Sequence, residues 1–276
     1  MKVTKHSGEV VEFDIEKLRL SLLKSGAEKD IVAAIVASVQ KSLFDGITTK
    51  QIYTRAFEEL KKHKRCDAAR YNLRSGLEML GPAGFYFEKY VSRLFDYLGY
   101  HTHGNLLLQG KSVTHEIDLV IQKKHQISIV ECKFHSIRES TTDVKVPMYI
   151  LSRFNDLKGN VYSIFSNSDY IDSCLIVTNT RFSEDAIIFS KYYGLELLSW
   201  DYPSGNGLKK KIDDSGLYPI TCLTSLSIEE KEALMMRDII VVNQLIGAKS
   251  ILDVVGISPL RFNRIEGEVK GLCNLK

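Results

Sequence analysis

Two carboxylates and a lysine lie in neighbouring segments whose apolar and polar residues alternate. Asp118 belongs to the segment 116–122, and Glu131 and Lys133 belong to the segment 127–134. The alternation predicts two strands, and a hairpin whose turn lies midway between them places Asp118 directly opposite Glu131. Cross-strand partners have Cβ atoms about 4.5 to 5.5 Å apart, so carboxylates in these positions repel each other unless a cation lies between them.

Such a pair of carboxylates predicts a site for Mg²⁺ or Mn²⁺, because these ions prefer hard oxygen ligands and also bind phosphate oxygens. A bound ion lowers the pKa of a coordinated water molecule, which can then hydrolyse a phosphodiester. Lys133 is two residues beyond Glu131 and shares its strand face, where an ammonium group could stabilise negative charge in the transition state. On spacing alone, a solvated hairpin with ordinary charged residues is an open alternative.

Helices and strands are expected on both sides of this hairpin. Apolar residues at helical spacing predict helices over 85–98, 144–157 and 183–193, and short apolar runs predict strands over 173–178 and 195–200. This order predicts an α/β sandwich around a central mixed sheet.

The expected helix 144–157 carries polar residues at positions i, i+4 and i+8, which share one helix face. These residues are Lys145, Tyr149 and Arg153. We expect this face to hold a DNA backbone, and an ordinary solvated helix side is the alternative.

The stretch from residue 81 to 203 resembles the PD-(D/E)xK nucleases and, within them, the Mrr-like restriction endonucleases. Those enzymes carry an acidic residue on the first helix, an Asp on a strand and a Glu-x-Lys motif on a further strand. Here Glu88, Asp118 and Glu131-Cys132-Lys133 match in the same order. The resemblance implies a DNA endonuclease whose catalytic residues are Glu88, Asp118, Glu131 and Lys133, with the metal on Asp118 and Glu131 and with Glu88 in support. Cleavage of both strands usually needs two copies of such a site, so a homodimer or higher homo-oligomer is expected.

The first 80 residues predict a β-hairpin followed by helices, and they resemble the ATP-cone, a small nucleotide-sensing module. The match runs through residues 3–8 and 13–17, although the family's usual Lys-Arg-Asp-Gly hairpin is altered by His6 and Ser7. The resemblance implies that ATP or dATP binds as a regulatory ligand. The expected contacts are Lys5 and Lys17 at the phosphates, Thr49 near the base or ribose, and Arg70 or Arg74 from the last helix. Because the sequence contains no glycine-rich P-loop, we expect nucleotide sensing rather than hydrolysis.

The last segment predicts three helices, over 228–244, 250–255 and 259–272, the last with Ser258 as N-cap and Pro259 at its first position. The residues around Gly256 faintly resemble a helix-hairpin-helix, whose turn offers backbone amides to a DNA phosphate. A helical packing module explains the same pattern.

The whole sequence therefore predicts a multidomain α/β protein. Its expected domains are a mostly helical ATP-cone with a β-hairpin (1–80), a restriction-endonuclease-like sandwich (81–205) and a small helical domain (206–276). The 276 residues contain no apolar run long enough to cross a membrane, and five scattered cysteines without a CxxC pair argue against a disulfide framework, so we expect a cytoplasmic protein. The formal net charge of +3 is too small to indicate nucleic acid by itself.

Two other functions stay open. One is a nucleotide-sensing regulator that binds DNA through a nuclease fold that no longer cuts. The other is a nuclease that acts on RNA or in repair.

Overall fold

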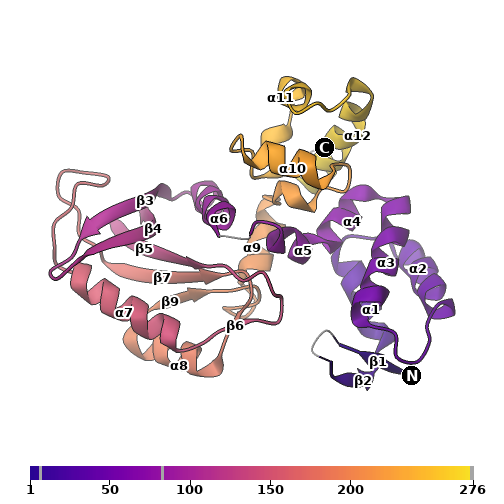
Figure 1. Cartoon of the computed structure of the whole chain (residues 1–276), viewed down its shortest axis with the longest axis horizontal. Helices are drawn as coiled ribbons and strands as arrows, with labels where there is room; N and C mark the ends of the chain where they lie inside the picture. Colours follow the sequence, from indigo (N-terminus) through magenta and orange to yellow (C-terminus); the bar gives the residue numbers. More distant parts are fainter. Residues whose placement is uncertain (6–7, 82–83, 274–276) are drawn as a thin grey trace. The chain divides into compact units, whose positions relative to one another are not determined.

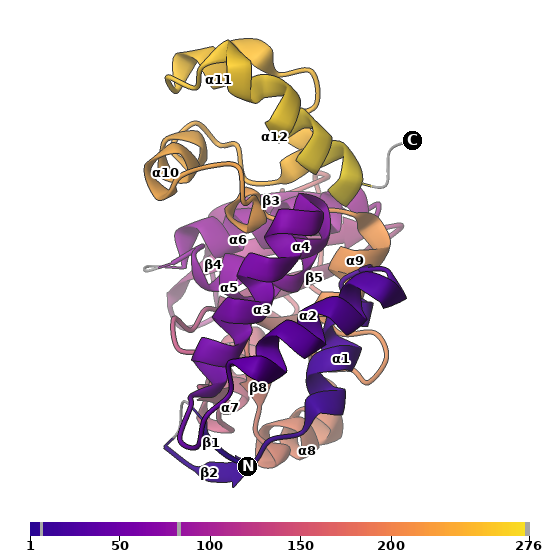
Figure 2. The same ribbon diagram turned by 90° about the vertical axis from the view of Figure 1, so that its right-hand side faces the viewer.

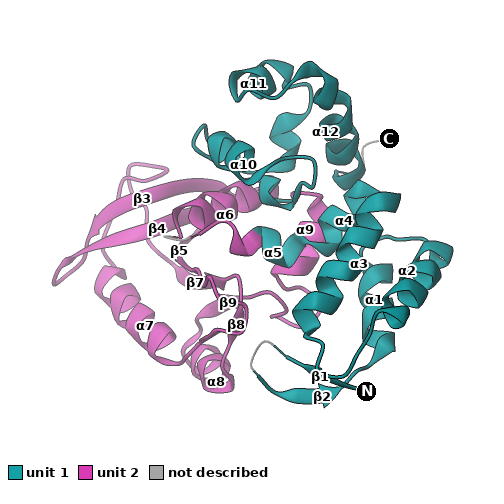
Figure 3. Cartoon of the chain, turned by 45° about the vertical axis from the view of Figure 1, so that its right-hand side comes forward, with its two compact units in different colours: residues 1–76, 218–276 teal, residues 77–217 magenta. Residues whose placement is uncertain are grey.

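The computed structural model describes residues 1–5, 8–81 and 84–273, so the hairpin positions His6 and Ser7 and the predicted boundary residue Pro82 lie outside the described part. The chain forms two compact units (Figure 3). Unit 1 combines Met1–Gly76 with Tyr218–Lys276, and unit 2 is Leu77–Leu217. The sequence predicts boundaries after residues 80 and 205, whereas the compact units divide after residues 76 and 217. The N-terminal and C-terminal segments thus share one unit, and the middle of the chain forms the other.

Unit 2 is built around a mixed five-stranded sheet with the order β3-β4-β5-β7-β9. β4 pairs antiparallel with both β3 and β5, whereas β7 pairs parallel with both β5 and β9. The bounds of the main elements are α6 (Phe85–Tyr97), β3 (His101–Gln109), β4 (Thr114–Lys123), β5 (Gln126–Lys133), α7 (Lys145–Leu157), β7 (Ser173–Thr178), α8 (Glu184–Tyr193), β9 (Glu196–Leu198) and α9 (Leu208–Ser215). Two short parallel strands, β6 (Thr141–Thr142) and β8 (Arg181–Phe182), form a separate pair.

Helices cover both faces of this sheet, with α6 on one face and α7 and α8 on the other (Figure 1). Ile150 and Phe154 of α7 pack in one buried cluster with Val120 and Ile129 of the sheet. Burial of this apolar surface stabilises the sandwich. The predicted mixed sheet is confirmed, but the sequence did not reveal the edge strand β3 or the helix α9.

The N-terminal part of unit 1 is a two-stranded hairpin followed by helices. Its elements are β1 (Lys2–Thr4), β2 (Val10–Glu12), α1 (Ile15–Lys24), α2 (Lys29–Lys41), α3 (Thr49–His63), α4 (Arg65–Tyr71) and α5 (Leu73–Glu78). Asp14 caps α1 by accepting from the backbone N–H of Glu16, and Thr48 and Gln51 form a reciprocal capping box at α3. A core of buried aliphatic residues joins the hairpin to these helices. The predicted helical domain with a hairpin is confirmed.

The C-terminal part of unit 1 is helical, with η1 (Ile220–Cys222), α10 (Ile228–Met235), η2 (Val242–Leu245), α11 (Lys249–Val254) and α12 (Pro259–Leu272). The predicted long helix 228–244 is wrong, because α10 ends at Met235 and Asp238 takes a left-handed conformation with φ of 61°. The buried β-branched residues 239–241 then lie outside any helix, and Val241 is extended with φ of −118° and ψ of 147°, a conformation for which such residues are well suited. The short helix η2 begins at the next residue, Val242. The end of α12 lies beside α4 (Figure 2).

Among the helices that the structure describes, none combines the length and the apolar character needed to cross a membrane.

Candidate functional site

The hairpin register predicted from the alternation is confirmed over five residue pairs of β4 and β5. Leu119 pairs with Val130, and the ladder continues to Lys123 and Gln126. Asp118 and Glu131 would form the next pair, but the ladder stops before them. Asp118 uses its side chain there, because Oδ2 accepts a hydrogen bond of 2.7 Å from the backbone N–H of Cys132. The carboxylate thus replaces a strand partner at the point where β4 and β5 separate.

Pairing is also interrupted at Asp118 on the other side of β4. The ladder with β3 includes Gly104 with Leu119 and Leu106 with Ile117, but omits the pair between them, Asn105 and Asp118. Asn105 has a φ of 53°, in the left-handed region that asparagine tolerates better than most residues. The side-chain alternation shifts at this point. Ile117 joins the core cluster of Val120 and Ile129, whereas Leu119, two residues beyond Ile117, is buried outside that cluster.

Glu131 is held by a cation from α7. Its Oε2 accepts a hydrogen bond of 2.6 Å from Nη1 of Arg153, and only 18% of the Glu131 side chain and 13% of the Arg153 side chain are exposed. Nη2 of Arg153 donates to the hydroxyl oxygen of Tyr149 at 2.9 Å. The helix face predicted to hold DNA is thus divided. Lys145 and Tyr149 are exposed, whereas the side chain of Arg153 points to the Glu131 carboxylate.

Three carboxylates of unit 2 lie close enough to influence one another. Burial, followed by the nearby Asp118 and Glu116 carboxylates, raises the pKa of Glu88 to about 7. Burial, followed by Asp118, raises the pKa of Glu131 to about 7 against the opposing effect of Arg153. Burial also raises the pKa of Asp118. Glu88 comes from the first turn of α6, so the structure brings this helix, β4 and β5 together at one cluster of mutually repelling acids.

Lys133 is exposed at the end of β5. The chain just beyond it is fixed by residues for which the sequence predicted no role. The side chain of buried Asn179 binds the backbone of His135 twice, accepting from its N–H and donating to its carbonyl oxygen, each at 2.8 Å. The His135 ring in turn contacts the buried hydroxyl of Thr142 at 2.9 Å. Asn179 directly follows β7, so this clamp extends the β5–β7 pairing past Lys133. Only the tertiary fold brings these residues together.

The oxygen donors suit Mg²⁺ in type, but they do not form a complete cage. Within the described residues, no group of three or more His, Cys, Asp and Glu side chains is arranged to hold a metal ion. Mg²⁺ commonly uses only one or two carboxylates and keeps several water molecules. Asp118 and Glu131 are two partly buried carboxylates of this kind, and Glu88 lies near enough for Asp118 to raise its pKa.

A cavity of about 270 Å³ in the N-terminal part of unit 1 is lined by three of the five residues predicted to bind nucleotide. Lys5, Lys17 and Thr49 line it together with Tyr53 and Tyr71, whose rings stack with centroids 4.8 Å apart. Each lysine has an acidic neighbour: Nζ of Lys5 is 2.8 Å from Glu9 and Nζ of Lys17 is 3.8 Å from Asp14. A cavity with ammonium groups and flat aromatic walls can accommodate phosphates and a base.

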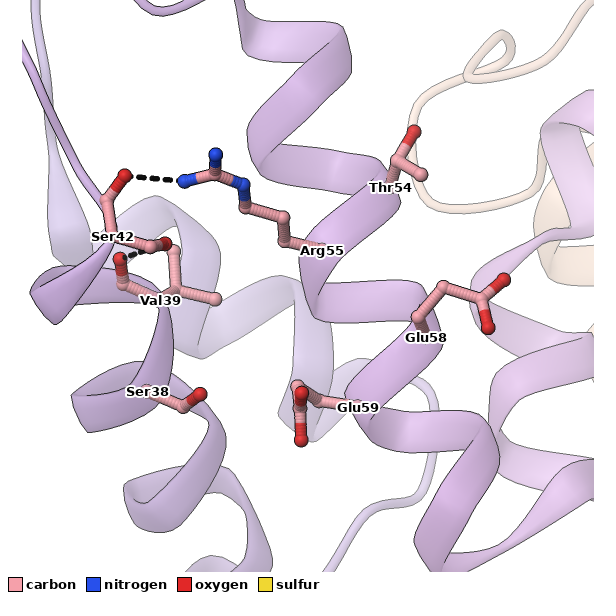
Figure 4. A pocket seen from close by; sticks show the side chains of 7 residues that line it. All are labelled: Ser38, Val39, Ser42, Thr54, Arg55, Glu58 and Glu59. Atoms are coloured by element: carbon pink, nitrogen blue, oxygen red, sulfur yellow. Dashed lines mark hydrogen bonds between the residues drawn. The ribbon is translucent and has the colours of Figure 1, made fainter.

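The two predicted arginines are not among the described residues that line this cavity. Arg70 instead contacts Asp67 and the C-terminal helix α12, and Arg74 belongs to α5. A second hollow between α2 and α3 contains none of the five predicted residues (Figure 4). Arg55 of this hollow donates to the carbonyl oxygen of Ser42, and Glu58 and Glu59 also line it.

Comparison with known proteins identifies both parts of unit 1. Residues 1–74 match the ATP cone domain family, and residues 218–273 match the family described as AF1548-like, C-terminal. An uncharacterized protein of Archaeoglobus fulgidus is 30% identical to this chain over 181 residues, which cover 65% of this chain and 98% of that protein. The chain belongs to the AF1548-like family.

A solved AF1548-like structure supports the same relationship. The crystal structure of the protein of unknown function AF1548 has a TM-score of 0.56 and 29% sequence identity, covering 70% of this chain and 99% of that one. Almost the whole of each relative is matched, whereas about a third of this chain lies outside each match. This AF1548-like protein therefore carries an ATP cone, a nucleotide-sensing domain, in addition to the family's own C-terminal helices.

Proposed function

We propose that this AF1548-like protein is a metal-dependent endodeoxyribonuclease of the PD-(D/E)xK type, controlled by an adenine nucleotide at its cone. The observation that carries the proposal is the convergence of Glu88, Asp118 and Glu131 at the point where β4 and β5 separate. Three partly buried acids that repel one another destabilise the metal-free fold, so a functional role is the simplest reason for the arrangement. Lys133 at the end of β5 completes the set of the Mrr-like nucleases.

In this proposal Asp118 and Glu131 hold Mg²⁺ or Mn²⁺. Glu88, on α6, supports them by adding negative charge near the ion. A bound ion would supply Lewis-acid stabilisation of the phosphate and a water of lowered pKa. The backbone N–H of Cys132 donates to Oδ2 of Asp118 and so fixes the orientation of this carboxylate. In the proposal, Oδ1 would then be available to the ion. The exposed ammonium of Lys133 can meet the charge that develops on the phosphate oxygens, and the clamp at His135 limits how far its strand moves.

The DNA backbone would lie along the exposed side of α7. Lys145 and Tyr149 face solvent there, on the helix whose Arg153 already reaches the acid cluster. The turn between α11 and α12, where Gly256 has a φ of 79°, is a second proposed phosphate contact. Two copies of the chain would be needed to cut both strands, so the proposed active form is a homodimer or higher homo-oligomer.

The nucleotide enters this proposal as a regulator. Adenine nucleotide binding is the property of ATP cone domains, and the cavity with Lys5, Lys17 and Thr49 is its proposed site. ATP or dATP would bind without hydrolysis.

One observation favours a second function, a nucleotide-sensing DNA-binding protein with an inactive nuclease fold. Arg153 neutralises Glu131 without a metal, and the described residues form no three-ligand metal group. In this alternative, the same fold binds DNA and the acid cluster no longer hydrolyses it.

One assay separates the two functions. Purified full-length protein is incubated with supercoiled plasmid, linear duplex or single-stranded DNA, with Mg²⁺, Mn²⁺ or EDTA, and with or without ATP or dATP. The nuclease proposal expects nicked or linear product that needs the divalent ion and disappears in the Asp118→Asn variant. DNA retardation without product under every condition supports the regulator. Product that persists in EDTA contradicts the metal site.

A further inference from the structure

The short helix α4 carries two different contacts on adjacent residues. Tyr71 lines the nucleotide cavity and stacks on Tyr53. Its neighbour Arg70 donates from Nη2 to the carbonyl oxygen of Gly271, in the last turn of α12, and from Nη1 to Oδ1 of Asp67 at 3.1 Å. Seven residues of helix therefore connect the ATP cone cavity to the C-terminal helices of the AF1548-like family.

This connection is buried and closely packed. Only 2% of the Asp67 side chain and 17% of the Arg70 side chain are exposed. The Gly271 carbonyl is one of the last four in its helix, which lack an intrahelical partner, and a guanidinium group there also meets the negative end of the helix dipole. A Cβ atom added to Gly271 would lie 2.8 Å from Sγ and 2.9 Å from Cβ of Cys66 on α4. Only glycine fits at this point without displacing one of the two helices.

We infer that α4 communicates nucleotide occupancy of the cone to the C-terminal helices through the contact between Arg70 and Gly271. A nucleotide that packs on Tyr71 stabilises α4 in the position in which Arg70 reaches α12. Nucleotide binding and docking of α12 then favour each other, and by linkage the effect is equal in both directions. Arg70, which the sequence assigned to the nucleotide itself, acts in this account as the connecting residue.

The inference rests on the nucleotide-binding half of the proposed function and is independent of DNA cleavage. It adds the part of unit 1 that responds to the nucleotide: ATP or dATP would change how firmly the AF1548-like helices pack on α4.

Two glycines of α12 provide a matched test. Gly271→Ala places a methyl group against Cys66, whereas Gly267→Ala places one in open space on the same helix. Both substitutions replace a glycine of α12 with the better helix former alanine, and only the one at Gly271 meets α4. Binding of ATP and of dATP to the full-length proteins is measured by titration calorimetry. We expect Gly271→Ala to bind at least about 5-fold more weakly than wild type, the lower end of typical allosteric coupling, and Gly267→Ala to bind as wild type does.

Hydrogen exchange provides a second measurement on the same proteins. ATP should protect the amides of α12 in wild type and in Gly267→Ala, and this protection should be lost in Gly271→Ala. If Gly271→Ala does not fold, Arg70→Lys takes its place, because it keeps the charge beside Asp67 and loses the fork that reaches α12.

Equal nucleotide affinities in the two glycine variants, or tighter binding by Gly271→Ala, would overturn the inference while leaving nucleotide binding intact. If wild type itself binds neither nucleotide, the proposed nucleotide control fails, and the inference fails with it.

Discussion

Arg153 donates from Nη1 to Oε2 of Glu131 at 2.6 Å, so a side-chain cation already neutralises the carboxylate on which the proposed metal site depends. The Nε atom of Arg153 is buried and, within the described part of the chain, has no hydrogen-bond partner. A divalent ion at Glu131 and this guanidinium group would share one negative charge. In the proposed nuclease, Arg153 would therefore weaken the binding of a divalent ion before DNA binds.

Arg153→Gln should raise the affinity for Mn²⁺ in the absence of DNA by at least about tenfold, because a positive charge a few ångströms away opposes a second cation. Mn²⁺ binding is followed by electron paramagnetic resonance. Lys158→Gln is the control, since it removes the same charge from the exposed end of α7. Equal Mn²⁺ affinities in the two variants would contradict competition at Glu131.

Asp118→Asn and Glu131→Gln should each abolish DNA cleavage. Loss of a metal ligand removes charge neutralisation and water activation together, so rates should fall on the order of 10³-fold or more. Mn²⁺ binding should weaken in parallel, while circular dichroism shows an intact fold. A folded Asp118→Asn protein that cuts at the wild-type rate would show that the acid cluster is not the active site.

Lys133→Ala should lower turnover much more than DNA affinity, because the ammonium group meets charge that develops only in the transition state. Single-turnover cleavage and DNA retardation separate the two quantities. Lys158→Ala, an exposed lysine outside the cluster, serves as the control. A drop in affinity without a drop in the single-turnover rate would reassign Lys133 to DNA binding.

Glu88→Gln should stabilise the metal-free protein as pH rises. The pKa of Glu88 is raised to about 7 in the fold, above its ordinary value near 4.5, so the folded state binds more protons between these values. Stability of the wild type therefore falls as pH rises through this window, and glutamine escapes the loss because it does not ionise. In EDTA, the melting temperature of Glu88→Gln should exceed that of the wild type by a few degrees at pH 8, and the two should be equal at pH 4.5. An advantage independent of pH would show that Glu88 ionises freely.

Lys17→Ala should weaken ATP and dATP binding and remove any response of DNA cleavage to nucleotide. A phosphate contact from a lysine is charge-assisted, so a loss of roughly tenfold or more in affinity is expected. Lys50→Ala is the matched control, since Lys50 is exposed beside Thr49 and does not line the cavity. Identical affinities for the two variants would place the nucleotide elsewhere.

The alternation of residues was sufficient to predict the β4–β5 register, because a shift by one residue would turn buried Leu119 and Val130 to the wrong faces. Helix caps also depend on nearby residues: the side chain of Asp14 caps α1, and Thr48 and Gln51 form the capping box of α3. These features depend on local chemistry alone.

Features that depend on distant partners could not be predicted in this way. Periodicity gives no sign that Asp118 leaves the ladder for an amide of β5, or that Asn105 opposite it takes a positive φ. The sequence also gives no sign that Arg70, which we expected to contact the nucleotide, donates to the carbonyl oxygen of Gly271, 201 residues away on α12. The apolar residues 239–242 fit the period of a helix, but the chain leaves α10 at Met235 and turns at Asp238, which has a φ of 61°.

The discontinuous unit 1 has a consequence for biosynthesis. Residues 1–76 leave the ribosome first, yet the surface of α4 that faces α12 stays uncovered until Gly271 has been made. At about 5 to 20 residues per second, the intervening sheet unit is synthesised in the meantime and has time to fold as an insert. Unit 1 can close only after α12 has been made, and contacts of such large sequence separation are expected to form slowly. In the coupling that we infer, a nucleotide bound to the cone before that step could not affect the position of α12.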